Sequence, residues 1–327
     1  MEVISVNNLS KSFEYYEKEA GLKSSLKNLF HREKLVREAV KSISFHIDEG
    51  EIVGFLGPNG AGKTTTLKVL SGILFPTGGE ALVLGYVPWE RKKMFKMNFS
   101  IVMGQKSQLW YDLPAIESFR LNQSIYEIGE TAFKATLDEL VDVLDVRDML
   151  KVQVRRLSLG ERMKMELIAA LLHRPKVMFL DEPTIGLDII SQRKIREFIR
   201  YYNEQTKTTV ILTSHYMNDI EALCKRTILI NQGRLVFDGD LARVNDLFSE
   251  KKILRLQLSD MADATVLSRF GEVKSCSGLE ATLEIQKDRV KEVAKEILDT
   301  LPVLDFTMED IPIEEGIALL YQRQVME

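Results

Sequence analysis

The segment Gly57-Pro58-Asn59-Gly60-Ala61-Gly62-Lys63-Thr64 decides the fold, because it matches the pattern G-x-x-x-x-G-K-[ST]. The apolar run Ile52–Leu56 before it predicts a buried β-strand, and the run from Thr65 onward predicts a helix. In that setting the backbone N–H groups of the loop and the N-terminus of the helix would surround phosphate oxygens. Lys63 would reach the β- and γ-phosphates, and the Thr64 hydroxyl would ligate Mg²⁺. A fortuitous glycine-rich turn is the alternative, and the flanking strand and helix argue against it.

Apolar, β-branched runs alternate with helical patterns around this loop, which predicts an α/β body. A helical stretch interrupts the alternation and predicts an inserted helical subdomain at about 112–165. Near the C-terminus the order becomes β-α-β-β-α-β, which is that of a ferredoxin-like α+β fold. We therefore expect an α/β domain at 1–245 and a small accessory domain at 252–327. The predicted strands are Ile52–Leu56, Ser100–Met103, Val177–Leu180, Thr209–Thr213 and Thr227–Ile230, then Ile253–Leu258, Val273–Ser277, Ala281–Ile285 and Val303–Met308; the C-terminal helices are Ala262–Phe270, Arg289–Thr300 and Ile313–Tyr321.

The composition excludes several classes of protein. Among 327 residues, 44 are basic and 48 are acidic, so the formal net charge is −4. A nucleic-acid partner usually requires a basic excess, and none is expected here. No apolar run approaches the roughly 20 residues that span a bilayer, and the start lacks the regions of a signal peptide. Two cysteines in no metal-like spacing, Cys224 and Cys276, fit a reducing cytoplasm. Any role at a membrane would be exerted from outside the lipid.

Two carboxylates, Asp181 and Glu182, follow the predicted strand Val177–Leu180. The carboxyl end of a parallel strand is the edge at which such sheets present ligands. Asp181 would hold Mg²⁺, directly or through water, and Glu182 would act as the general base that polarises an attacking water. The alternative is a simple helix cap or turn, because Pro183 and Thr184 come next.

A further motif precedes the strand Val177–Leu180, and one predicted helix separates the two. This motif is Leu157-Ser158-Leu159-Gly160-Glu161-Arg162. Ser158 and Glu161 form the S-x-x-E pattern of a capping box, so an ordinary capped helix is one interpretation. The other is an anion site, because a helix N-terminus binds negative charge. Ser158 and the Gly160 backbone would then hold the γ-phosphate of ATP that is bound to a second copy of the chain.

With its motifs in this order, the chain resembles the ATP-binding subunits of the ABC transporter superfamily, from Val3 to about Asp240. The resemblance implies an ABC-type P-loop ATPase, with ATP and Mg²⁺ as ligands and ATP hydrolysis as its activity. It implies dimerisation with an identical or a related subunit, and integral-membrane permease subunits as partners. It also implies a place on the cytoplasmic face of the inner or plasma membrane.

The same resemblance assigns roles to further residues. Gln105 would contact Mg²⁺ and couple to the permease, Asp188 would form the D-loop, and His215 would sense the γ-phosphate. Phe13 would stack on adenine, although Tyr15 and Tyr16 are close competitors. The predicted site thus has Glu182 and His215 as catalytic residues and Thr64, Gln105 and Asp181 around the metal. Its nucleotide contacts are Phe13, Gly57, Pro58, Asn59, Gly60, Ala61, Gly62, Lys63, Thr64, Thr65, Gln105, Ser158, Gly160 and Asp188.

The chain departs from the family pattern in two places. The signature is usually Leu-Ser-Gly-Gly-Gln, and here its third and fifth positions are Leu159 and Glu161, which could weaken contact with a partner's nucleotide. An insertion at about 14–38, between Phe13 and a strand expected near Val40, replaces the short hairpin that the family normally has there. Its apolar residues share one helical stripe, and residues 21–41 hold six Lys or Arg against two Glu. Such a basic amphipathic segment would rest on anionic lipid or the permease, or else pack on its own domain. The stripe consists of Leu22, Leu26, Leu29 and Phe30.

The insertion and the segments 85–89, 103–110 and 158–164 narrow the resemblance to a bacterial exporter subfamily described as viologen-exporter-like. We therefore expect the motor subunit of an exporter. Two other classes stay open. An ABC ATPase that acts on ribosomes or DNA would usually carry two ATPase units or long coiled coils, and neither is evident here. A regulator that binds ATP without hydrolysing it would not need Glu182 and His215.

Overall fold

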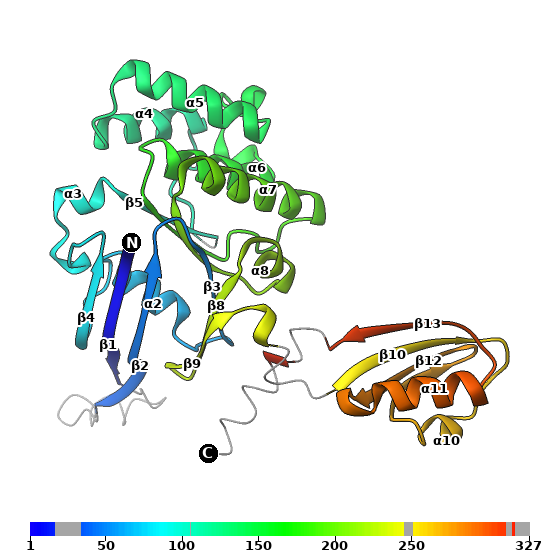
Figure 1. Cartoon of the computed structure of the whole chain (residues 1–327). Helices are drawn as coiled ribbons and strands as arrows, with labels where there is room; N and C mark the ends of the chain where they lie inside the picture. The colour runs from blue at the N-terminus through cyan, green and yellow to red at the C-terminus, as the bar shows by residue number, and fades with distance from the viewer. Residues whose placement is uncertain (17–33, 105, 245–250, 312–315, 318–327) are drawn as a thin grey trace, which may run out of the picture. The chain divides into compact units, whose positions relative to one another are not determined.

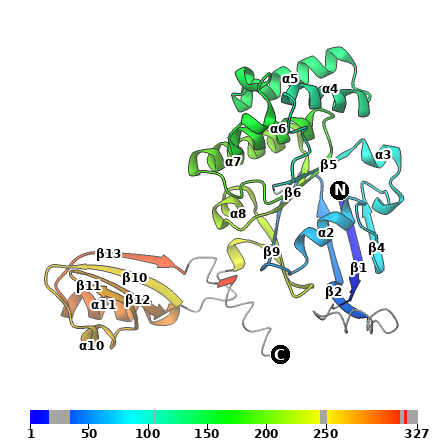
Figure 2. The same cartoon turned by 180° about the vertical axis from the view of Figure 1, so that it is seen from behind.

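The computed structural model describes residues 1–16, 34–104, 106–244, 251–311 and 316–317. The chain divides into two compact units, Met1–Gly239 and Asp240–Glu327, which are described separately (Figures 1 and 2). Within the described residues, no helix combines the length and the apolar character needed to cross a membrane. Most of the predicted amphipathic segment and of the predicted helix at 313–321 lies outside those residues.

A six-stranded sheet in the order β5-β6-β7-β3-β8-β9 forms the centre of the first unit. All the printed pairings among β5, β6, β7, β3 and β8 are parallel. The five strands predicted for this region are confirmed, because buried parallel strands read as continuous apolar runs. The structure adds β9, which the sequence reading missed. The bounds are β3 Ile52–Leu56, β5 Phe99–Met103, β6 Val177–Asp181, β7 Thr209–Thr213, β8 Arg226–Asn231 and β9 Arg234–Asp240.

A second, antiparallel sheet in the order β2-β1-β4 was not predicted as a sheet, although β2 contains the strand that was expected near Val40. Its strands are β1 Glu2–Tyr15, β2 Leu35–Asp48 and β4 Gly78–Val83. β1 and β2 extend into both ends of the stretch that we expected to be an insertion, with Tyr15 opposite Leu35. Alternate residues of β2, Ile43 and Ile47 among them, are buried, which is the signal that a strand with one solvent-exposed face gives.

Side chains from both sheets and from α2 (Lys63–Leu70) share one hydrophobic core. Phe55 and Phe179 from the parallel sheet meet Ile4 and Ile43 from the antiparallel sheet and Leu67 from α2. Each such side chain, when fully buried, contributes roughly 1.5–3 kcal/mol. This core fixes the loop between β3 and α2 against the ends of the neighbouring strands.

Helices gather at the other end of the first unit. In both views α4 and α5 lie at that end, with α6 and α7 next to them, and β1, β2 and β4 lie on the opposite side (Figures 1 and 2). The interrupting helical stretch is therefore confirmed, although it divides into two helices. The bounds are α4 Ala115–Ile125, α5 Glu130–Leu144, α6 Leu159–Leu171, α7 Ile189–Thr206 and α8 Met217–Leu223; the shorter pieces are η1 Pro88–Glu90, α3 Lys93–Lys96, η2 Arg147–Met149 and η3 Val154–Arg156.

The second unit contains a four-stranded antiparallel sheet in the order β11-β12-β10-β13. This is the strand order of a ferredoxin-like β-α-β-β-α-β fold, as predicted. The first predicted helix is shorter than expected, because Asp263 caps it at Thr265 and its residues after Ser268 leave the helix. The bounds are β10 Lys251–Leu258, α10 Ala264–Leu267, β11 Glu272–Ser277, β12 Glu280–Gln286, η4 Lys287–Arg289, α11 Val290–Thr300 and β13 Val303–Asp310.

Candidate nucleotide-binding site

The glycine-rich loop turns from β3 into α2, and its backbone requires glycine. Gly62 has φ 111°, a region that other residues rarely adopt, and a Cβ there would lie 2.4 Å from the Ala39 carbonyl oxygen. No side chain caps the start of α2. The first N–H groups of this helix are thus left for an anion, which is what a phosphate-binding loop needs.

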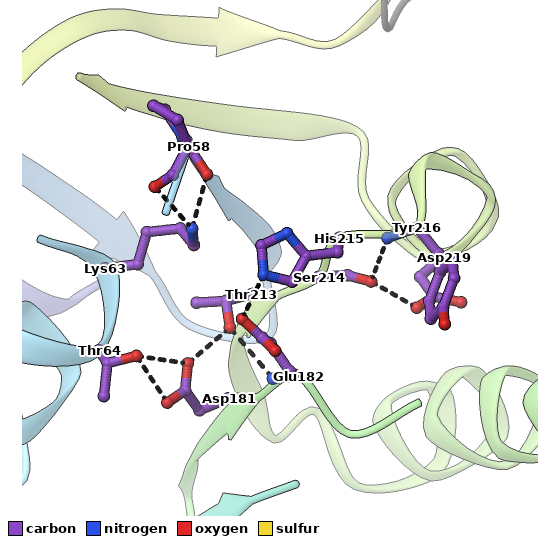
Figure 3. Close-up of polar contacts among 11 residues, drawn as sticks. Pro58, Lys63, Thr64, Asp181, Glu182, Thr213, Ser214, His215, Tyr216 and Asp219 are labelled. Atoms are coloured by element: carbon purple, nitrogen blue, oxygen red, sulfur yellow. Dashed lines mark hydrogen bonds and ion pairs between the residues drawn. The ribbon is translucent and has the colours of Figure 1, made fainter. Parts of the chain in front are cut away.

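Lys63 lies over this loop rather than in solvent (Figure 3). The side chain is only 6% exposed, and Nζ donates to the carbonyl oxygens of Gly57 at 2.6 Å and Pro58 at 3.2 Å. Burial lowers the pKa of Lys63, and the nearby carboxylates of Glu182 and Asp181 partly oppose that shift. A buried ammonium with only carbonyl partners favours an anionic ligand, because its charge is not locally neutralised by a direct ion pair.

Asp181 ends β6 and accepts hydrogen bonds from two hydroxyl groups, those of Thr64 and Thr213 (Figure 3). Thr64 Oγ1 donates to Oδ2 at 2.8 Å, and Thr213 Oγ1 donates to Oδ1 at 2.7 Å. Asp181 thereby connects Thr64 of the phosphate loop to the ends of the parallel strands β6 and β7. Hydroxyl and carboxylate oxygens are the donors that Mg²⁺ prefers.

Glu182 and His215 contact each other at the same edge of the sheet (Figure 3). His215 Nε2 lies 2.8 Å from Glu182 Oε1, and a carboxylate oxygen can only accept, so Nε2 carries the hydrogen. Glu182 Oε2 is buried and has no hydrogen-bond partner in the described part of the chain. The backbone of Glu182 has φ 57°, and its N–H donates to Thr213 at 3.1 Å. A strained residue with an unpaired buried oxygen is a common feature of functional sites.

A buried carboxylate that the sequence reading missed holds the segment around His215. Asp219 of α8 accepts from Ser214 Oγ at 2.6 Å and from Arg196 Nη1 at 2.8 Å, and it also accepts from the Thr184 hydroxyl. The Ser214 oxygen in turn accepts from the Tyr216 N–H. This network fixes both residues that flank His215.

A cavity of about 590 Å³ opens beside the loop. Phe13 and Tyr15 both line it, so Tyr15 stays a competitor for the adenine, whereas Tyr16 is not among its lining residues. Lys11 Nζ lies 5.0 Å from the centroid of the Phe13 ring. The lining includes Arg37, which the sequence reading did not consider. The predicted site residues that line the cavity are Phe13, Asn59, Gly60, Ala61, Gly62, Lys63, Thr64, Thr65 and Glu182.

The other predicted residues that the structure describes do not line this cavity: Gly57, Pro58, Asp181 and His215 lie near it in the contacts given above, whereas Ser158, Gly160 and Asp188 belong to α6 and the start of α7. Ser158 caps α6 in the expected capping box, with its N–H donating to Glu161 at 2.8 Å. A Cβ on Gly160 would lie 2.5 Å from the oxygen of Ser191, which itself donates to Asp188 at 2.6 Å. Gly160 therefore has a packing reason to be glycine within its own chain. Gln105 lies outside the described residues.

The two departures from the usual signature have local explanations. The Leu159 side chain lies against Gly186, where a Cβ would be 3.1 Å from Leu159 Cδ2. The Glu161 carboxylate accepts from the Ser158 N–H at the positive end of α6. Neither change removes the Ser158 hydroxyl or the Gly160 backbone from the start of the helix.

Glu166 of α6 is a second buried carboxylate that sequence reasoning missed. It is 4% exposed and accepts from Ser107 Oγ at 2.6 Å and from the Gln108 N–H at 3.0 Å. Burial raises the pKa of Glu166, and these hydrogen bonds oppose the shift. The carboxylate therefore ties the segment that follows position 105 to the helix that begins at Leu159.

We expect Glu166→Ala to lower the free energy of unfolding of the first unit by about 2–4 kcal/mol, because the donors of Ser107 and Gln108 would lose their acceptor. Denaturant unfolding followed by circular dichroism would measure the loss. Glu197→Ala is the matched control, since Glu197 is an exposed helical glutamate whose ion pair with Arg193 should contribute under about 1 kcal/mol. Equal effects of the two changes would contradict a structural role for Glu166.

Comparisons with known proteins agree with this geometry. A family profile described as "ABC transporter" matches residues 40–185, and one described as "EvrA-like ABC transporter, C-terminal domain" matches residues 250–309. The Bacillus subtilis (strain 168) protein NatA, an ABC transporter ATP-binding protein, is 34% identical over 212 residues, which is 65% of this chain and 86% of NatA. The linearmycin resistance ATP-binding protein LnrL of the same organism is 33% identical over 229 residues, covering 70% and 73% of the two chains.

Solved structures share the fold. The solved structure of an ATP-binding subunit of an ABC transporter superposes with a TM-score of 0.62 at 22% identity, over 75% of this chain and 93% of the other. A dimeric post-hydrolysis state of the ATP-binding cassette MJ0796 with ADP and Pi superposes with a TM-score of 0.60 at 21% identity, over 72% and 98%. Together with the matching relatives, these findings lead to one conclusion: the chain belongs to the ABC transporter ATP-binding proteins, the ATPase subunits of these transporters.

Proposed function

We propose that this chain is the motor of an exporter, in which two ATPase subunits close around ATP and drive a separate permease. The proposal rests on the observation that the predicted nucleotide contacts fall into two groups at different places in the chain. Lys63, Thr64 and Glu182 line one cavity, whereas Ser158 and Gly160 lie at a helix start outside it. A nucleotide in the cavity would therefore leave α6, whose start carries the signature segment and which we call the signature helix, free to contact the nucleotide of a second copy.

In this proposal the triphosphate binds to the uncapped start of α2 and to Lys63. Lys63 exchanges its contacts with the Gly57 and Pro58 carbonyl oxygens for phosphate oxygens, which bear more negative charge. The adenine stacks on Phe13 or Tyr15 at the other end of the cavity. Binding thus uses the aromatic and the cationic ends of one cavity.

Mg²⁺ fits the residues that are present. Among the described residues no three or more His, Cys, Asp or Glu side chains gather into a metal site, so a cation here would rely on phosphate oxygens and water, as Mg²⁺ commonly does. Thr64 and Asp181 would hold it. When bound, it would neutralise charge on the transferring phosphoryl group.

Hydrolysis in this proposal depends on Glu182. Its unpaired Oε2 would accept a hydrogen bond from the attacking water and orient it toward the γ-phosphorus. The water oxygen forms a bond to phosphorus as the bond to the β-γ bridging oxygen breaks; one proton of the water passes to the Glu182 carboxylate, and ADP leaves with the bridging oxygen. His215, whose Nε2–H donates to Glu182, would hold the carboxylate in place and would lie beside the γ-phosphate. An intact pair of this kind argues against a regulator that only binds ATP.

The permease would dock on the segment that follows position 105 in the sequence. Trp110 and Tyr111 are each 50% exposed, and Leu113 is 40% exposed, directly after the segment that Glu166 anchors. Exposed aromatic residues are typical of protein interfaces. Outward transport agrees with the relative that is named for linearmycin resistance. We also propose the cytoplasmic membrane face as the location, and domains at 1–245 and 252–327.

Lys63→Ala is the direct test of the nucleotide site. We expect the affinity for ATP to fall about 100-fold, because the variant loses a charged contact with the phosphates. Isothermal titration calorimetry would measure the dissociation constant, and phosphate release would measure hydrolysis. Lys134→Ala is a control with the same change of charge, since Lys134 is an exposed residue of α5 that pairs with Glu130 and does not line the cavity. Unchanged binding by Lys63→Ala would refute the assignment.

A further inference from the structure

We propose that Arg37 binds a phosphate group of the nucleotide and acts as a second cation beside Lys63. The inference rests on the proposed function, because it assumes that ATP or ADP occupies the cavity. It adds a residue to the binding site that neither the phosphate-loop pattern nor the family's usual motifs include.

The first support is the position of Arg37 in the antiparallel sheet. Arg37 of β2 lies directly opposite Phe13 of β1. Residues that are paired in this way project their side chains from the same face of a sheet. Both side chains line the cavity, so Arg37 enters it beside the aromatic residues.

The second support is the reach of the side chain. One terminal nitrogen, Nη2, lies 3.1 Å from the position that a Cβ on Gly60 would take. Gly60 has φ 79° and carries no side chain, so nothing on that residue separates the guanidinium from the phosphate loop. Arg37 therefore spans the cavity from its aromatic end to its phosphate end.

The third support is that the guanidinium has no assigned partner. The hydrogen bonds and ion pairs found among the described residues include none for Arg37, whereas Arg196 and Arg226 both pair with carboxylates. The five N–H donors of an arginine suit phosphate oxygens, which accept in a bidentate geometry. A triphosphate that lies near Glu182 carries more negative charge than the Lys63 ammonium balances, so a second cationic side chain lowers the electrostatic cost of binding.

Two other roles lead to different expectations. A surface arginine that stays in water would contribute nothing to binding. An arginine stacked on the base would change the preference between ATP and GTP and would respond little to salt. A phosphate contact affects ATP and GTP equally and weakens as salt screens the charge.

The test is calorimetric titration of the full chain with ATP and GTP in the presence of Mg²⁺, in a Glu182→Gln background that prevents hydrolysis. We expect Arg37→Ala to weaken both nucleotides about tenfold at low salt, and the loss to shrink at high salt. Arg37→Lys should recover part of the affinity. Arg255→Ala is the matched control, because Arg255 is exposed, pairs with Glu309 and lies in the other unit.

Each outcome decides the question. Unchanged binding by Arg37→Ala, while Lys63→Ala loses it, would overturn the role of Arg37 and leave the proposed function intact. A loss for ATP that GTP does not share would also overturn it, in favour of a base contact. If Arg255→Ala lost as much nucleotide affinity, the change in net charge alone would explain the effect, and the role of Arg37 would be overturned. If Lys63→Ala also binds normally, the proposed function itself fails.

Discussion

Glu182→Gln should convert the chain into a dimer that forms only with ATP. The amide keeps the size of the side chain but can no longer act as a base, so ATP stays bound and unhydrolysed. A persistent triphosphate would then hold two copies together, through Lys63 of one and Ser158 of the other. Size-exclusion chromatography with light scattering, in ATP-Mg²⁺, in ADP and without nucleotide, would show a doubled mass only in ATP.

The controls separate the possible causes of such a dimer. Adding Ser158→Arg to Glu182→Gln should abolish the dimer, because the new side chain would occupy the start of α6. Glu197→Gln, an exposed glutamate of α7, should leave the wild-type behaviour unchanged. A variant that binds ATP but stays monomeric would mean that Leu159 and Glu161 have disabled the contact or that the permease must supply it. A dimer that is indifferent to nucleotide would implicate the second unit and contradict the proposal.

The parts of the fold that follow from local sequence were predictable. β3 and β7 occur at the predicted residues, and β6 ends at Asp181, directly before Glu182, because buried parallel strands are short apolar runs bounded by polar loops. Since the carboxyl ends of these strands meet at one edge, Lys63, Asp181 and His215 could be expected together. The contact between Glu182 and His215 agrees with that expectation, although the catalytic roles stay predictions.

Other features depend on contacts between segments that are distant in the sequence, and they could not be predicted from local sequence patterns. β2 alternates buried and exposed side chains, so it lacks the continuous apolar run by which the strands of the parallel sheet stand out in the sequence. Arg37 enters the cavity only because β2 pairs with β1 in a register that sets it opposite Phe13. Glu166 and Asp219 look like ordinary helical acids, and only their burial and their donors reveal them. No local pattern reports such long-range contacts.

The signature helix shows why a departure from a motif needs structural interpretation. Leu159 and Glu161 suggested a weakened contact when they were read as replacements. In the structure Leu159 packs on Gly186 and Glu161 completes the cap, so each has a partner within its own chain. The Ser158 hydroxyl accepts one hydrogen bond from the Glu161 N–H, and its own hydrogen stays available for a phosphate oxygen.

A mixture of two inactive variants should recover ATP hydrolysis. Lys63→Ala lacks the phosphate contact in its own cavity, and Ser158→Arg lacks the contact with a partner's nucleotide, so each homodimer has two defective sites. A mixed dimer has one complete site, built from Lys63 of the Ser158→Arg chain and Ser158 of the Lys63→Ala chain. Phosphate release from an equal mixture should therefore rise well above that of either variant alone.

This recovery distinguishes a shared site from one contained in a single chain. If Ser158 served the nucleotide of its own chain, every site in the mixture would carry one of the two defects, and mixing would restore nothing. Lys63→Ala mixed with Glu182→Gln is the control, because both residues line the same cavity and no mixed dimer can then contain a complete site. Recovery in the first mixture and not in the second would follow only if the site is divided between two chains, because the phosphate loop and the signature helix would then act on the same nucleotide from opposite subunits.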